Sequence, residues 1–205
     1  MPLIGLETIA TRRSIRRYRR EAVPERLVDT LLQAMACAPS AHNRQPWRVA
    51  RIESAEWKQR LARAMGDRLR ADRRADGDAE AEIERDVDRS HARITEAPVV
   101  LVLCLDMADM DGYADDRRRN AEYLMAVQSV AMAAQNLLLA AHAEGIGACW
   151  MCAPLFCPDT VASTLSLPRG WEPQALITLG RPADAGKPRP RRPLDAFVWR
   201  PDTSI

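Results

Sequence analysis

The chain has 205 residues, of which 47% are hydrophobic and 28% are charged. This composition is typical of a folded globular domain and excludes a disordered or fibrous protein. Thirty basic side chains against 28 acidic ones give a formal net charge of +2, which argues against a general nucleic-acid-binding protein. Only Lys58 and Lys187 are lysines, so 28 of the 30 are arginines, whose planar forks suit phosphates and carboxylates.

Two features bear on where the protein resides. The N-terminus lacks the basic segment and the apolar core of a signal peptide, and the five cysteines are an odd number. The most apolar stretch, residues 124–141, is interrupted by Gln128, Ser129, Gln135 and Asn136, which fall on one helical stripe. We therefore expect a cytoplasmic protein with reduced thiols, in which this stretch is a buried helix and not a membrane span.

Helical and strand patterns follow one another along the chain. In the first half they predict, in order, a helix from Pro24 to Pro39, a polar loop over 40–46, a strand over 47–52, a helix capped by Ser54, exposed charged helices over 68–93 that join near Gly77, and a buried strand over 99–105. In the second half they predict a polar excursion over 106–119, a long helix over 120–143 ending before Gly145, a strand over 146–151, a short helix from Pro158, a strand over 174–179, a proline- and arginine-rich arm over 181–193, and a possible terminal strand over 194–199. We expect one domain, residues 1–205, in which the excursion is long enough to be a lid or a substrate loop.

The first candidate site is a basic segment near the N-terminus. Residues 12–18 read Arg-Arg-Ser-Ile-Arg-Arg-Tyr, with four arginines in seven residues. The simplest interpretation is a solvated basic face, and a nucleic-acid-binding arm is a second, although the segment lacks interleaved aromatic residues. A phosphate clamp is the third, because guanidinium groups and the Ser14 hydroxyl all donate hydrogen bonds to anionic oxygens.

The second candidate site is the loop after the first long helix. It places Ser40, Asn43, Arg44 and Gln45 between two prolines. Amide side chains carry both donors and an acceptor, which suits a flat heterocycle with alternating hydrogen-bonding edges. His42 in the same loop is either a catalytic acid or base or an ordinary exposed histidine.

Two further motifs carry weaker signals. Cys149, Cys152 and Cys157 form C-x2-C-x4-C, for which a zinc site, a redox pair and ordinary buried thiols are the alternatives. Residues 145–147 resemble the start of a dinucleotide-binding fingerprint, but they precede a strand, and Trp150 stands where the third glycine belongs. A Rossmann site is therefore not indicated, and the sequence contains no P-loop, nucleophile elbow or zinc-protease motif.

Taken together, the motifs resemble the FMN-dependent nitroreductase family. The resemblance rests on R-R-S-x-R-x-aromatic at 12–18, on P-S-x-x-N-x-Q-P-W at 39–47, on Gln-Asn-Leu-Leu at 135–138 and on the arginine-rich tail. Segment 149–173 is similar to the flavin domain that is fused to bacterial ligases that glutamylate a deazaflavin coenzyme; no ligase domain accompanies it here. The resemblance implies an α+β fold with a mixed sheet flanked by helices, in an intertwined homodimer with FMN at the subunit interface.

The resemblance also implies a set of cofactor-binding residues. They are Arg12, Arg13 and Ser14 at the FMN phosphate and ribityl chain, Arg16 near the pyrimidine edge, Ser40, Ala41 and Asn43 reaching the same flavin from the partner subunit, Trp150, Met151, Cys152 and Ala153 along the isoalloxazine, and Arg189 and Arg191 completing the phosphate clamp. Many relatives have glutamate and glycine where this chain has Cys152 and Ala153, so the surroundings of the flavin differ there. The excursion over 106–119 would form part of the substrate mouth.

The implied activity is ping-pong hydride transfer. NADH or NADPH gives a hydride to the flavin, and a nitroaromatic, a quinone or a similar conjugated small molecule then accepts the electrons. Because the flavin carries the chemistry, no catalytic side chain and no metal are expected. The alternatives are a reductase or remodelling enzyme in flavin or deazaflavin cofactor biosynthesis, and a non-catalytic flavin-binding protein. Neither nucleic acid nor a membrane is an expected partner.

Overall fold

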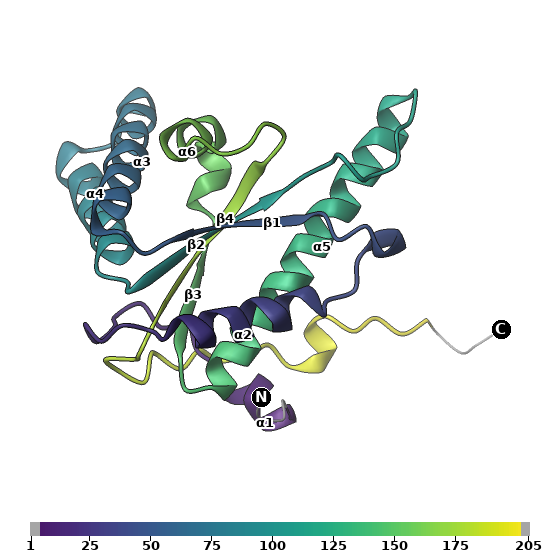
Figure 1. The fold of residues 1–205 in the computed structure, drawn as a ribbon, viewed down its shortest axis with the longest axis horizontal. Coiled ribbons are helices and arrows are strands. Elements are labelled where there is room, and N and C mark those ends of the chain that lie inside the picture. Colours follow the sequence, from purple (N-terminus) through teal and green to yellow (C-terminus); the bar gives the residue numbers. More distant parts are fainter. Residues whose placement is uncertain (1–4, 202–205) are drawn as a thin grey trace.

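A four-stranded antiparallel sheet forms the centre of the fold (Figure 1). The computed structural model describes residues 5–201. The strands lie in the order β1-β2-β4-β3 and are β1 (Trp47–Ile52), β2 (Val99–Leu105), β3 (Gly147–Met151) and β4 (Glu172–Gly180). The helices are α1 (Leu6–Thr11), α2 (Glu25–Ala36), α3 (Ala55–Ala75), α4 (Glu80–Thr95), α5 (Asp116–Ala143) and α6 (Pro158–Leu165), with short 3-10 helices η1 (Ala41–Asn43), η2 (Ala153–Phe156) and η3 (Leu194–Ala196). The expected α+β class is confirmed.

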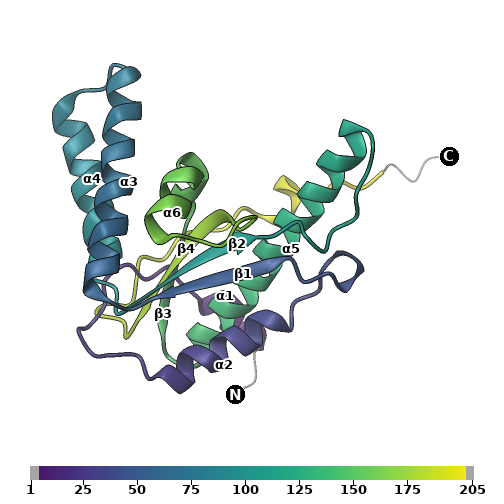
Figure 2. The same ribbon diagram turned by 45° about the horizontal axis from the view of Figure 1, so that its top comes forward.

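Strand β2 explains why helices cover both faces of the sheet. All seven of its residues are buried, and successive side chains point to opposite faces. Leu101 and Leu103 enter the core that α2 and α5 build, whereas Val100 and Val102 enter a second core, which α3, α4 and α6 cover (Figure 2). The continuous apolar run in the sequence therefore marks a strand that is buried on both sides, as predicted.

Helix α5 is the long apolar helix of the sequence analysis. Its length and its mean hydropathy of 1.5 over 18 residues are enough for a membrane span, yet half of that window is buried inside the fold. It packs against α2 and the sheet, which makes it a core helix of this unit. It begins four residues before the predicted start, because the Asp115 carboxylate accepts a hydrogen bond of 2.9 Å from the Arg118 N–H and caps the helix. It ends before Gly145, whose φ of +69° only glycine adopts readily.

The two ends of the chain differ from the sequence expectations. Helix α1 was not predicted, because six residues are too few to show a helical period. The predicted terminal strand over 194–199 is wrong: η3 takes its first three residues and the remainder is coil. Asp195 is the one polar residue in 194–199, so the segment shows no polar–apolar alternation. No described strand pairs with it, so it has no ladder to join.

Candidate functional site

A cavity of about 710 Å³ lies where three distant segments of the chain meet. The N-terminal segment, the C-terminal half of α4 and the tail beyond β4 supply its lining: Arg12, Arg13, Ser14, Arg16, Arg17, Arg89, Ala92, Arg93, Glu96, Asp184, Gly186, Lys187, Arg189 and Arg191. Six of the thirteen site residues named from the sequence are among them, from both ends of the chain. The proposed phosphate clamp is therefore one surface in space.

The N-terminal segment is held against strand β3 by its backbone. The Ile15 N–H donates a hydrogen bond of 3.0 Å to the Ala148 carbonyl oxygen, and Ser14 forms a parallel bridge with Ala148. Further along, the Tyr18 hydroxyl contacts the Ile15 and Thr178 carbonyl oxygens at 2.6 and 3.0 Å. Burial raises the pKa of Tyr18 well above its usual range, so this hydroxyl stays protonated. Ile15 enters the core, and its neighbours in sequence line the cavity.

The half-buried arginines of the cavity repel one another. Burial lowers the pKa of Arg12, and the positive charges of Arg191 and Arg13 lower it further. The pKa of Arg93 is also lowered, first by burial and then by Arg16 and Arg89. Arg12 and Arg93 therefore lie among other guanidinium groups, with too few carboxylates among the described residues to balance them. A cluster of this kind favours an anionic ligand.

Two of these arginines, Arg89 and Arg93, were not identified from the sequence. They lie four residues apart on α4, so they share one helix face. The sequence analysis assigned this segment only to exposed charged helices. The spacing of the pair was visible there, but nothing local shows that this face of α4 meets the N-terminal segment.

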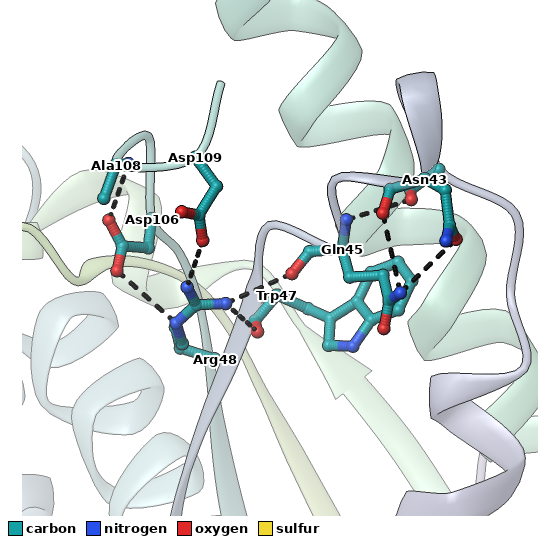
Figure 3. A network of polar contacts seen from close by, with 8 residues as sticks. Asn43, Gln45, Trp47, Arg48, Asp106, Ala108 and Asp109 are labelled. Atoms are coloured by element: carbon teal, nitrogen blue, oxygen red, sulfur yellow. Dashed lines mark hydrogen bonds and ion pairs between the residues drawn. The ribbon is translucent and has the colours of Figure 1, made fainter. Parts of the chain in front are cut away.

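The residues Ser40, Ala41 and Asn43 lie outside this cavity, in and beside η1. The loop is strained, because His42, Asn43 and Gln45 all have a φ between 50° and 56°. It is held by hydrogen bonds from the Gln45 N–H to the Ser40 hydroxyl at 3.0 Å and from the Ala41 N–H to the Ser129 hydroxyl at 3.3 Å. The Gln45 amide also contacts the Asn43 side-chain oxygen at 3.3 Å (Figure 3). The loop therefore presents polar side chains in one defined arrangement.

The excursion after β2 is tied to this loop by ion pairs. The Arg48 guanidinium lies 3.4 Å from carboxylate oxygens of both Asp106 and Asp109 (Figure 3). Arg44 pairs with Asp111 at 2.6 Å. The exposed Arg44–Asp111 pair contributes little alone, whereas the Arg48 and Asp106 side chains are only 27% and 15% exposed. Together the pairs join residues 106–111 to the η1 loop and to β1. This part of the predicted excursion is therefore anchored, and its last four residues belong to α5.

The residues Trp150, Met151, Cys152 and Ala153 lie at the end of β3 and the start of η2. The Trp150 indole N–H is 2.8 Å from the Cys152 sulfur. Burial raises the thiol pKa of the preceding Cys149, and the charges of Arg16, Arg93 and Arg12 oppose part of that rise. None of the four residues named from the sequence lines the cavity, so their contact with the isoalloxazine remains a prediction.

The cysteine cluster is a set of free thiols. Cys149 and Cys157 are buried and Cys152 is exposed. Burial raises the pKa of the first two, which makes them poor nucleophiles. Within residues 5–201, no three His, Cys, Asp or Glu side chains are grouped as a metal site would require.

A histidine next to the clamp gives a pH prediction. The Thr11 hydroxyl is 2.9 Å from His142 Nε2, and the pKa of His142 is lowered from 6.5 by burial and then by Arg12 and Arg13. The unfolded chain therefore binds the proton more readily, so the folded state is destabilised as pH falls below about 6.5. We expect the melting temperature to fall less between pH 7.5 and 5.5 in His142→Asn than in the wild type. Equal slopes in the two proteins would contradict this assignment.

Comparison with known proteins identifies the family. Residues 9–181 match the nitroreductase family, and the chain belongs to that family. It is 34% identical to an NADH dehydrogenase of Thermus thermophilus, over 98% of each chain. It is 29% identical to the 5,6-dimethylbenzimidazole synthase of Rhodospirillum rubrum, covering 92% of this chain and 85% of that protein. A protein of Desulfovibrio desulfuricans assigned to the nitroreductases, whose structure is a complex with FMN, superimposes with a TM-score of 0.73 at 29% identity over 96% of each chain.

Family membership confirms the class of enzyme expected from the sequence, an FMN-dependent NAD(P)H oxidoreductase. The individual contacts to the flavin remain predictions, as does the similarity to the flavin domain of deazaflavin ligases.

Proposed function

We propose that the chain works as a homodimer that passes a hydride from NADH or NADPH, through FMN, to a nitroaromatic, a quinone or a similar conjugated acceptor. The observation that carries this proposal is the convergence of Arg12, Arg13, Arg189 and Arg191 on one cavity. Those arginines come from opposite ends of the chain, and the family resemblance implied all four of them as phosphate ligands. Their chemistry fits the phosphate of FMN.

The phosphate is held by charge-assisted hydrogen bonds. A guanidinium group has only hydrogen-bond donors, and a serine hydroxyl donates its proton to a phosphate oxygen. Arg13 is oriented by hydrogen bonds of 2.8 and 2.9 Å from its Nη1 to the Ala10 and Arg12 carbonyl oxygens. Arg191 lies close enough to Arg12 to lower its pKa. A dianion between them removes that repulsion.

Arg16 and Arg93 also line the cavity, and the positive charge of Arg16 contributes to lowering the pKa of Arg93. We assign them to the pyrimidine edge of the isoalloxazine, where they favour negative charge. FMN, when bound, supplies the hydride chemistry. The chain's own side chains bind the cofactor, orient it and set its electrostatic surroundings, and none of them needs to act as an acid or a base.

A second subunit accounts for the apolar side chains that a single chain leaves exposed. On α5, Leu124 and Met132 are 56% and 41% exposed, and in the tail Phe197 and Trp199 are 66% and 83% exposed. Large apolar side chains left exposed in this way favour association. The η1 loop lies outside the cavity of its own chain, so in our proposal it contacts the flavin of the partner subunit. We also place the dimer in the cytoplasm, in agreement with five unpaired thiols.

A second candidate function is a reductive or remodelling step in flavin or deazaflavin cofactor biosynthesis. The similarity to 5,6-dimethylbenzimidazole synthase supports it, and the predicted resemblance of segment 149–173 to the flavin domain of deazaflavin ligases agrees with it. Turnover of a cofactor precursor, together with failure to reduce simple nitroaromatics and quinones, would favour this candidate.

The purified protein tests the proposal directly. We expect a yellow protein containing FMN that NADH or NADPH bleaches without oxygen and that a nitroaromatic or a quinone reoxidises. A colourless preparation that cannot be reconstituted with FMN would contradict the proposal. Bound FMN that neither nicotinamide bleaches would identify a non-catalytic flavin-binding protein.

A further inference from the structure

The cavity carries more positive charge than one FMN phosphate can neutralise. Nine of its lining side chains are cationic and two are acidic, whereas a phosphate monoester brings about −1.5 to −2 at neutral pH. On the α3–α4 hairpin, by contrast, Arg70 and Arg73 pair with Glu84 and Asp86 at 2.7 and 2.6 Å. Because the whole chain has a formal net charge of only +2, nine cations against two acids at one cavity are a local concentration of positive charge.

Two exposed lining cations lack a carboxylate of their own, and we call them the rim cations. Lys187 in the tail is exposed and forms no ion pair with any described residue. Arg89 on α4 is 58% exposed, and its partner Asp86 also pairs with Arg73. Arg17, by contrast, is 77% exposed but pairs with Asp184 at 2.9 Å. The two rim cations come from different segments and line the same cavity.

We infer that Lys187 and Arg89 bind a phosphate or carboxylate group of a molecule that exchanges electrons with the flavin, a group beyond the pyrophosphate that NADH and NADPH share. The inference rests on the proposed function, because FMN must first occupy Arg12, Arg13, Arg189 and Arg191. A cleft lined by one sign of charge concentrates ligands of the opposite sign. Each charge-assisted hydrogen bond to such a group adds selectivity over an uncharged analogue.

Two sources supply this chemistry. The hydride donor can carry it, as the extra phosphate of NADPH relative to NADH. The electron acceptor can carry it instead, as a carboxylate on an aromatic ring. Two pairs of compounds distinguish these sources: two hydride donors that differ in the extra phosphate, and two electron acceptors that differ in the carboxylate.

The test compares kcat/KM for NADPH against NADH with one uncharged acceptor, and for 4-nitrobenzoate against 4-nitrobenzamide with one donor. We expect the charged member of at least one pair to be favoured about tenfold, which corresponds to about one hydrogen bond to a charged group. Added salt should weaken this preference. In the double variant Arg89→Gln with Lys187→Gln it should fall to about twofold or less.

Arg85→Gln is the matched control. Arg85 lies one turn before Arg89 on α4, is 68% exposed and does not line the cavity. This variant should keep the preference of the wild type. A preference confined to the first pair assigns the anionic group to the donor, and one confined to the second assigns it to the acceptor.

Three outcomes would overturn the inference. They are equal kcat/KM within both pairs in the wild type, a preference that survives in the double variant, and loss of FMN from the double variant, which would assign the rim cations to the cofactor itself. The visible spectrum of each protein separates these results from failure of the proposed function, because a wild type without flavin contradicts the function and not the charge preference.

Discussion

The double variant Arg12→Ala with Arg189→Ala is expected to lose FMN while its fold is kept. Each arginine offers charge-assisted hydrogen bonds to the phosphate, worth roughly 1.5–3 kcal/mol. Loss of two such contacts weakens FMN binding by a factor on the order of 10² to 10⁴. The fold should not suffer, because Arg12 is a desolvated charge among other arginines and Arg189 is exposed.

The flavin content from the visible spectrum and the affinity from titration with FMN measure this effect, and a thermal melt reports the fold. Arg20→Ala with Arg85→Ala is the matched control, since it removes two exposed arginines that do not line the cavity. We expect this control to bind FMN as the wild type does. If the Arg12 and Arg189 variant is isolated with a full complement of flavin, the assignment of the clamp is wrong.

Elements whose signals are local were predicted correctly from the sequence. Strand β2 is an uninterrupted apolar run bounded by Pro98 and Asp106, and its observed range is the predicted one. The end of α5 at Gly145 follows from a glycine in the left-handed region. The start of α5 was placed too late, because the charged residues 116–119 suggest a loop unless the Asp115 cap is recognised.

The cavity was predicted in part, for a physical reason. Arg12, Arg13 and Ser14 belong to one short motif, so they are found together in the sequence. Arg93 lies some 80 residues away and reaches the same cavity only because α4 packs across the sheet. Contacts between distant segments leave no local pattern, so no periodicity or spacing identifies them.

The ion pairs around Arg48 illustrate the same limit. The sequence shows acidic residues in the excursion and Arg48 in the predicted strand over 47–52, and such charged residues usually belong to solvated surfaces. They meet because β1 and β2 are antiparallel neighbours, with Trp47 opposite Leu105. This register places Arg48 beside Asp106 and Asp109. The anchoring of the excursion is thus a property of the sheet topology.

Gly147 is expected to be a backbone position on which the placement of the N-terminal arginines depends. A Cβ atom at this position would lie 2.8 Å from Cγ2 and 2.9 Å from Cβ of Ile15. Ile15 is only 7% exposed and its N–H is hydrogen-bonded to Ala148, so it has little room to move. Gly147→Ala should therefore destabilise the fold by about 1–3 kcal/mol and, by displacing Ser14 and Arg16, weaken FMN binding roughly tenfold.

A double-variant cycle tests whether this contact is the cause. Removing the larger part of the Ile15 side chain with Ile15→Ala leaves space for the new methyl group, so Gly147→Ala should cost less in that background. The cost should not vanish, because Cβ of residue 15 stays close. Chemical denaturation and FMN titration of the four proteins measure both effects. Gly112→Ala, where the added Cβ meets nothing within 4 Å, is the control. If the two substitutions prove additive, the N-terminal segment is held in place by something other than the Gly147–Ile15 contact.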